Sequence, residues 1–205
     1  MITLKKYAAI DIGSNAMRLL IVNIVEQEGK EPQFNKSSLV RVPIRLGQDA
    51  FTVGEITEEN IDRMCDAMTA FHLLMKVHKV QSYRAFATSA MREAYNGKEI
   101  VELIQEKANV TIEIIDGKKE AAIIASTDLL YLLNTDKTYL FVDVGGGSTE
   151  FTLFSNGKMV NSKSFKAGTV RLLNDMVCDI VWLEIEKWIK TNTLDYEEVT
   201  LIGSG

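Results

Sequence analysis

The 205-residue sequence has only two cysteines, Cys65 and Cys178, which lie far apart with no cysteine or histidine beside them. This pattern excludes a disulfide framework and gives no zinc motif, so both are expected to be free thiols in a reducing compartment. The two histidines, His72 and His78, are six residues apart, a spacing that does not put them on one helix face for a metal. We expect both histidines to be structural or solvated.

Long apolar runs and excess positive charge are also missing. No run of about 18 apolar residues occurs, and the N-terminal apolar run is too short for a signal peptide. The net charge of −5 argues against a general polyanion-binding surface, so neither DNA nor a membrane is an expected partner. With 46% hydrophobic and 25% charged residues, the chain has ample material for a core. We therefore expect a globular, cytoplasmic protein.

The most informative stretch is residues 139–154, which reads YLFVDVGGGSTEFTLF. Two apolar runs are separated by three glycines, two hydroxyl residues and a glutamate, which predicts a strand, a tight turn and a second strand. Glycines can adopt positive φ and turn several backbone N–H groups toward one point, where phosphate oxygens would bind. The alternative is an ordinary glycine-rich hairpin, which has no need of the carboxylates and hydroxyls. The candidate phosphate-binding residues are Gly145, Gly146, Gly147 and Ser148.

Carboxylates flank this predicted phosphate site, because Asp143 ends the first strand and Glu150 begins the second. Two carboxylates beside a phosphate would repel it unless a divalent cation lay between them. The sequence therefore predicts a Mg²⁺ ion at this position.

A similar pattern occurs at residues 7–25, which read YAAIDIGSNAMRLLIVNIV. Alignment of the two stretches on their first tyrosines places Asp11 on Asp143 and Gly13 on Gly145. Each copy continues through a polar turn into a third strand, which predicts two lobes of like topology with their Asp-Gly turns on opposite walls of one cleft. A chance resemblance between two hairpins is the alternative. The expected fold is α/β with mixed sheets flanked by helices, in lobes 1–133 and 134–205.

The remaining chain alternates between expected helices and strands. Helices are expected at 57–80, 98–108, 118–133 and 177–191, and further strands at 34–46, 82–88, 110–115, 159–166 and 199–202. A strand at the last residues is unusual for a complete domain, so the second lobe is expected to be truncated. Arg92 follows strand 82–88 at the expected start of the next helix, where helix N–H groups and its guanidinium could bind an anion, although a capped helix with a solvated arginine is the simpler alternative. Glu120 lies in the first turn of a helix, a position that the helix dipole alone can explain.

Five motifs occur in order along nearly the whole chain: DIGSN at 11–15, VRVPIRLG at 40–47, TSAMREA at 88–94, IIDGKKEA at 114–121 and DVGGGSTE at 143–150. Together they resemble the exopolyphosphatase and guanosine pentaphosphate phosphohydrolase family. This family belongs to the superfamily of actin-like and sugar-kinase-like proteins, whose duplicated lobes are ribonuclease H-like.

The resemblance implies a role for each candidate residue. Glu120 would be the general base that positions a water, and Arg92 would clamp the terminal phosphate. Mg²⁺ would be held by Asp11, Asp143 and Glu150, and the terminal phosphate would be bound by Ser14, Asn15, Gly145, Gly146, Gly147 and Ser148. These roles suit phosphoryl transfer, which needs mainly positioning and charge neutralisation.

The sequence departs from the family pattern in three places. Lys118 and Lys119 stand before Glu120, where further acidic residues are usual, and Ala16 and Met17 replace a hydroxyl and aromatic pair. The continuation after Ser204 and the C-terminal helical domain of long-chain polyphosphate-degrading members are missing. A processive enzyme is therefore not expected.

The expected function is Mg²⁺-dependent release of terminal orthophosphate from inorganic polyphosphate or guanosine pentaphosphate. One alternative is an ATP-dependent small-molecule kinase of the same superfamily, and another is a non-catalytic sensor of polyphosphate or guanosine tetra- and pentaphosphate. The sequence does not choose between the two substrates, and it leaves a homodimer open.

Overall fold

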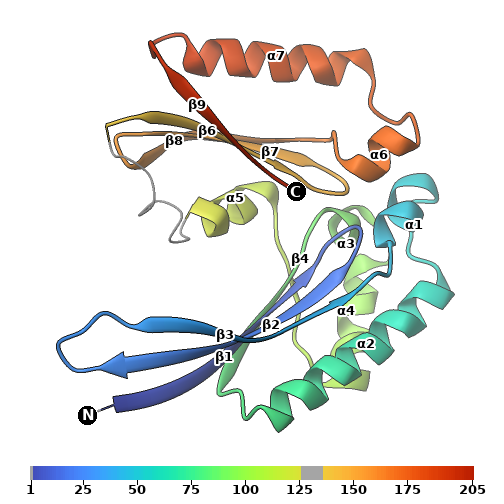
Figure 1. The fold of residues 1–205 in the computed structure, drawn as a ribbon. Helices are drawn as coiled ribbons and strands as arrows, with labels where there is room; N and C mark the ends of the chain where they lie inside the picture. Colours follow the sequence, from blue (N-terminus) through green and yellow to red (C-terminus); the bar gives the residue numbers. More distant parts are fainter. Residues whose placement is uncertain (1, 126–135) are drawn as a thin grey trace. The chain divides into compact units, whose positions relative to one another are not determined.

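The computed structural model describes residues 2–125 and 136–205, and these residues form two compact units, Met1–Ile114 and Ile115–Gly205. Each unit contains its own β-sheet (Figure 1). The lobe boundary expected near residue 133, and the later part of the helix expected at 118–133, lie outside the described residues. The expected cleft between the lobes stays a prediction.

The sheet of the first unit has five strands in the order β3-β2-β1-β4-β5. The first three form an antiparallel meander, β4 pairs in parallel with β1, and β5 pairs in parallel with β4. Side chains alternate along β1, so Ile10 and Ile12 are buried while Asp11 between them is partly exposed. The strands are β1 (Ile2–Ile12), β2 (Met17–Gln27), β3 (Gln33–Val42), β4 (Ser82–Ala87) and β5 (Glu113–Ile114).

Two long helices of the first unit, α2 and α4, pack against each other on one side of this sheet (Figure 1). The face of α2 that carries Met64, Met68 and Phe71 is buried, as their helical spacing predicts. Two short helices, α1 and α3, also contact each other. The helices are α1 (Leu46–Thr52), α2 (Glu58–Val77), α3 (Ser89–Glu93) and α4 (Gly97–Ala108).

The second unit repeats this topology. Its sheet has the order β8-β7-β6-β9, again an antiparallel meander with the last strand parallel to the first. The elements are α5 (Gly117–Ala125), β6 (Thr138–Val144), β7 (Thr149–Ser155), β8 (Lys158–Phe165), α6 (Thr169–Leu173), α7 (Asp179–Thr193) and β9 (Val199–Ser204). The predicted α/β class with mixed sheets and helices is therefore confirmed, as is the like topology of the two halves.

The core of the second unit lies between α7 and one face of its sheet. Phe151, Phe165 and Trp188 pack edge to face, with ring centroids 5.4 to 6.3 Å apart, around the buried Leu153. Helix α5 packs against β7 and β8 (Figure 1). The sheet is thus covered by α7 on one face, and α5 lies over part of the other.

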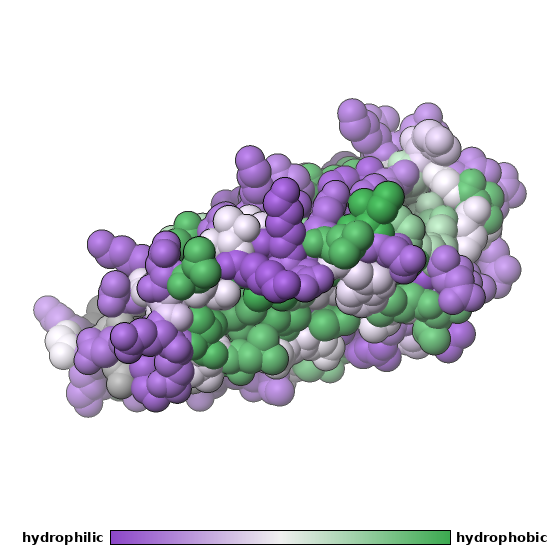
Figure 2. Space-filling view, turned by 90° about the horizontal axis from the view of Figure 1, so that it is seen from above, coloured by the Kyte–Doolittle hydropathy of each residue, from purple (hydrophilic) through white to green (hydrophobic). Residues whose placement is uncertain are grey.

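Helix α7 is apolar on its outer side as well. Figure 2 shows apolar side chains among charged ones on the face seen from above, where α7 lies. Exposed apolar side chains of α6, α7 and their connection are Leu172, Leu173, Met176, Ile180, Trp182 and Leu183. None of the described helices is long and apolar enough to cross a membrane.

The structure corrects several expected boundaries. The strand expected at 34–46 ends at Val42, before Pro43, and a helix that we did not predict, α1, follows. The strand expected at 110–115 pairs with β4 at two residues alone, although Val110 and Ile112 are buried. Helix α6 was also not predicted, because five residues are too few to show a helical period.

Candidate phosphate and metal site

The glycine-rich turn after β6 is closed by a hydrogen bond in which the Gly145 N–H donates to the Ser148 carbonyl at 2.9 Å. Our expectation of positive φ in this turn is wrong, since none of its three glycines adopts it. A further glycine, Gly168, approaches the backbone of this turn so closely that Gly168 has no room for a side chain. A Cβ on Gly168, which precedes α6, would lie 2.4 Å from both the carbon and the oxygen of the Gly146 carbonyl.

The start of α6 fixes the direction of the peptide groups in this turn. A trans peptide points its C=O and N–H in opposite directions. Since the carbonyls face α6 and Arg171, the N–H groups of the next residues point to the other side, and none of them donates to a residue that the structure describes. Three hydrogen bonds orient these carbonyls. The Thr169 N–H donates to the Gly145 carbonyl at 2.9 Å, the Val170 N–H to the Gly146 carbonyl at 2.8 Å and the Arg171 Nε–H to the Gly147 carbonyl at 2.8 Å.

These N–H groups, on Gly146, Gly147 and Ser148, form a set of donors on one side of the turn. Residues 147 and 148 are buried, and buried N–H groups normally have an acceptor. An anion with several oxygens, such as a phosphate, would satisfy such a set. Four of the predicted phosphate-binding residues therefore lie in one turn whose N–H groups suit a phosphate, namely Gly145, Gly146, Gly147 and Ser148.

Four polar residues lie in register across the second sheet, one on each strand. The order is Ser204 on β9, Asp143 on β6, Glu150 on β7 and Ser164 on β8. We call these four residues the polar row. The Ser204 hydroxyl donates to Asp143 Oδ1 at 2.5 Å, and the Ser164 hydroxyl donates to Glu150 Oε1 at 2.7 Å. The two carboxylates at the centre of the row are thus neighbours across two paired strands.

Glu150 is buried, with 3% of its surface exposed, and its Oε1 also accepts from the Ser148 hydroxyl at 2.6 Å. Like charges directly opposite each other on paired strands repel, so the pair of Glu150 and Asp143 would gain from a cation beside it. Oxygen donors from two carboxylates are what Mg²⁺ takes from a protein, the remaining ligands being waters and substrate phosphates. No group of three or more His, Cys, Asp or Glu side chains suited to a metal occurs among the described residues. The donors thus fit Mg²⁺ but not a closed metal cage.

Helix α5 brings Glu120 to the same unit. A Cβ on Gly117 would lie 2.9 Å from the Ser164 Cβ, so the start of α5 rests on the end of β8. Glu120 is half-buried one turn later, while Lys118 and Lys119 are exposed. An open pocket of about 400 Å³ lies here, lined by Asp116, Gly117, Lys118, Ser162, Lys163 and Ser164. Helix α5, which carries the predicted base Glu120, therefore contacts the polar row at Ser164.

The first unit holds the other predicted residues. Its matching turn is closed by the Gly13 N–H and the Ala16 carbonyl at 3.1 Å. The Ser14 and Asn15 carbonyls accept from the N–H groups of Gly47 and Arg45 at 2.7 and 2.9 Å. The start of α1 therefore orients this turn as the start of α6 orients the other. In both halves, N–H groups at the start of a short helix bind the carbonyls of the turn.

Asp11 pairs with Arg18 in the first hairpin, where Oδ2 and Nη1 are 2.9 Å apart and both side chains are about half exposed. These two residues occupy the positions that Asp143 and Glu150 occupy in the second hairpin. The charge of Asp11 is thus balanced within its own hairpin, and its role as a metal ligand stays a prediction.

The Ser14 hydroxyl is buried and lies 2.9 Å from the Ser89 hydroxyl. Helix α3 is joined to β1 because the Thr88 N–H donates to the Ile12 carbonyl at 3.1 Å. Arg92 lies in the last turn of α3, not at the start of a helix as we expected, because α3 is a separate five-residue helix. Asp11, Ser14, Asn15 and Arg92 thus belong to one unit, and Glu120, Asp143, the glycine turn and Glu150 belong to the other.

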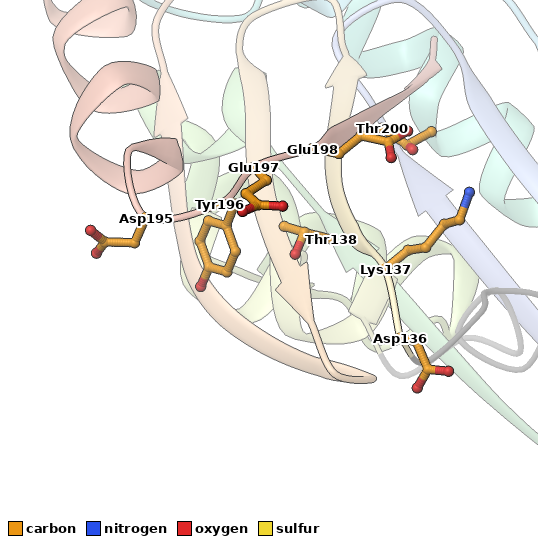
Figure 3. Close-up of a pocket in the computed structure, with 8 residues that line it drawn as sticks. All are labelled: Asp136, Lys137, Thr138, Asp195, Tyr196, Glu197, Glu198 and Thr200. Atoms are coloured by element: carbon orange, nitrogen blue, oxygen red, sulfur yellow. The ribbon is translucent and has the colours of Figure 1, made fainter.

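A second open pocket, of about 330 Å³, lies at the opposite end of β6 and β9 from the polar row. Figure 3 shows that its acidic side chains come from the segments before these two strands. It is lined by Asp136, Lys137, Thr138, Asp195, Tyr196, Glu197, Glu198 and Thr200. None of the predicted site residues lines it, so we do not place the candidate site there.

Residues 24–191 match the model of the Ppx/GppA phosphatase family. The chain belongs to this family. Among curated Ppx/GppA relatives, exopolyphosphatase 2 of Mycobacterium tuberculosis is 30% identical over 174 residues, which cover 82% of this chain and 54% of the relative. A bifunctional 3-dehydroquinate synthase/phosphatase of Fusobacterium nucleatum is 29% identical over 207 residues, covering 93% of this chain and 30% of that protein. The chain thus spans about half or less of the length of these two proteins.

Solved structures of Ppx/GppA proteins have the same fold. An exopolyphosphatase from Cytophaga hutchinsonii is 26% identical, with a TM-score of 0.80 over 98% of this chain and 67% of that one. The Aquifex aeolicus family member has a TM-score of 0.75 at 24% identity, over 99% of this chain and 67% of that one, which shows the fold alone. The expected actin-like fold is therefore confirmed.

Proposed function

We propose that this chain is a Mg²⁺-dependent phosphohydrolase that releases terminal orthophosphate from inorganic polyphosphate or guanosine pentaphosphate. The observation that supports this most is the combination in one unit of three N–H donors, two adjacent carboxylates and a helix that carries Glu120. Its membership of the Ppx/GppA family and its likeness to exopolyphosphatases support the same substrate class.

The N–H groups of Gly146, Gly147 and Ser148 would bind oxygens of the terminal phosphate. Asp143 and Glu150 would hold Mg²⁺, which when bound neutralises charge on the phosphate oxygens. Glu120 would accept a proton from a water as the water oxygen bonds to the terminal phosphorus. The bond from phosphorus to the bridging oxygen would then break, its electron pair would stay on that oxygen of the shortened chain or nucleotide, and the attacked phosphorus would be released as orthophosphate.

The test is orthophosphate release from short polyphosphate, long polyphosphate and guanosine pentaphosphate, with Mg²⁺ and with chelator. We expect Glu120→Gln to lower the rate about 10²- to 10⁴-fold, the usual contribution of a general base. Glu106→Gln, the same change at an exposed site on α4, is the matched control and should keep full activity.

Release from none of the substrates by a folded protein would refute the hydrolase. Release that persists in Glu120→Gln would refute the assigned base alone. Binding of polyphosphate without release would favour the alternative of a non-catalytic sensor.

A further inference from the structure

We propose that Ser164 and Ser204 are positioning residues that hold the two carboxylates of the polar row for the metal. This inference rests on the Mg²⁺ site of the proposed function. The two serines lie on the outermost strands of the second sheet, β8 and β9, at the two ends of the row. Each donates its hydroxyl to one oxygen of the neighbouring carboxylate, at 2.7 Å to Glu150 Oε1 and at 2.5 Å to Asp143 Oδ1.

A strand fixes the Cα and Cβ of each serine, so the hydroxyl restrains the carboxylate that it contacts. The restraint selects one carboxylate rotamer and removes freedom that the cation would otherwise have to remove on binding. Partners that hydrogen-bond to metal ligands typically change metal affinity about 10- to 100-fold when they are lost. Ser164 has a second role in packing, because it also contacts Gly117 at the start of α5.

The first unit offers an internal comparison. Its equivalent row pairs Asp11 with Arg18, and the flanking residues in register are Phe86 on β4 and Arg41 on β3. There a guanidinium holds the carboxylate, and no serine stands at either end of the row. Flanking hydroxyls therefore accompany the acidic pair and not the neutralised one, as expected if they serve a cation site.

The experiment measures metal binding to the free protein without substrate. Mn²⁺ is the probe, its unbound fraction is followed by electron paramagnetic resonance, and Mg²⁺ competition gives the Mg²⁺ affinity. We expect Ser164→Ala and Ser204→Ala each to raise the Kd about tenfold or more. Ser204→Thr keeps a hydroxyl at an exposed position and should bind nearly as the parent does.

The matched control is Ser162→Ala. Ser162 lies on the same face of β8, but its hydroxyl lies 3.0 Å from the Thr152 hydroxyl and contacts no carboxylate among the residues that the structure describes. It should leave the Kd unchanged. A further readout is the Mg²⁺ dependence of orthophosphate release. High Mg²⁺ should restore the rate of Ser204→Ala, whereas the rate of a variant with a misfolded site would not recover.

The proposal is overturned if Ser164→Ala and Ser204→Ala bind Mn²⁺ like the parent while Asp143→Asn does not. If Ser164→Ala fails to fold, Ser204→Ala decides the matter, because its side chain is exposed. If the parent protein and Asp143→Asn bind equally, the metal site of the proposed function is itself wrong. If the parent protein binds Mn²⁺ as expected but releases no orthophosphate, the proposed hydrolase is refuted and this inference on metal binding still stands.

Discussion

Replacement of Gly168 by alanine should destabilise the second unit, because there is no room for a methyl group. Its Cβ would lie 2.4 Å from the carbon and oxygen of the Gly146 carbonyl and 2.5 Å from the Gly147 carbonyl carbon. These are backbone atoms that cannot rotate away, and they would have to move by about 1 Å to reach the 3.4 Å at which ordinary contacts begin. Overpacking typically costs about 1–3 kcal/mol, and a clash with three backbone atoms belongs at the upper end.

The assay is urea unfolding followed by tryptophan fluorescence. Both tryptophans of the chain, Trp182 and Trp188, lie on α7, so the signal reports the second unit. With a urea dependence of about 1 kcal/mol/M for a small domain, the midpoint should fall by about 2–3 M. Activity should fall in any protein that stays folded, because a displaced α6 no longer orients the glycine turn.

Gly203→Ala is the matched control, since a Cβ at that glycine would meet nothing within 4 Å. Its unfolding midpoint should stay close to that of the parent. A midpoint for Gly168→Ala equal to that of the parent would refute our account that α6 approaches the glycine turn because Gly168 has no side chain.

Two further predictions concern other parts of the chain. Burial alone would raise the pKa of Asp49, but hydrogen bonds from Thr57 and Asn60 outweigh it and hold the pKa below its ordinary value. The stability that ionised Asp49 gives to the folded protein is therefore fully present above the ordinary carboxyl pKa and is lost as the pH falls through the lowered pKa. In urea unfolding followed by circular dichroism, Asp49→Asn should lower the free energy of unfolding by about 1–2 kcal/mol at pH 7 and by progressively less as the pH falls through the lowered pKa; a loss that does not change with pH would contradict this. Burial raises the pKa of the Cys65 thiol, whereas Cys178 is exposed, so iodoacetamide should label Cys178 in the native protein and Cys65 after denaturation alone, as mass spectrometry would show.

Sequence patterns predicted the strands, the long helices and the duplication, because alternation and helical spacing reflect burial within a single element. They did not predict α1 and α6, which are short and act through hydrogen bonds to turns far away in the sequence. The glycine turn was predicted, but its three glycines do not adopt the expected positive φ, and its contact with Gly168 could not be predicted because only the folded chain brings the two segments together.

Ser164 and Ser204 illustrate a different limit. Ser164 stands in an ordinary strand, and nothing local distinguishes it from other serines such as Ser162, while Ser204 stands between two glycines beyond the expected end of its strand. Their contact with a carboxylate depends on the register between strands, where a shift of one residue would turn the side chain to the other face. The same holds for the buried Arg171. The sequence shows an arginine at this position, but its hydrogen bond to the Gly147 carbonyl could not be predicted from it.

The two hairpins show how one topology can carry opposite electrostatics. Both have an aspartate at the same place in the first strand, and the residue opposite it is Arg18 in one and Glu150 in the other. The first hairpin supplies its own cation, while the second places two carboxylates side by side and surrounds them with hydroxyl donors. An acidic pair at directly opposite positions of adjacent strands is unfavourable for folding. Its place beside a set of N–H donors supports our proposal that a cation and a phosphate bind there together, each reducing the repulsion that the other would meet alone.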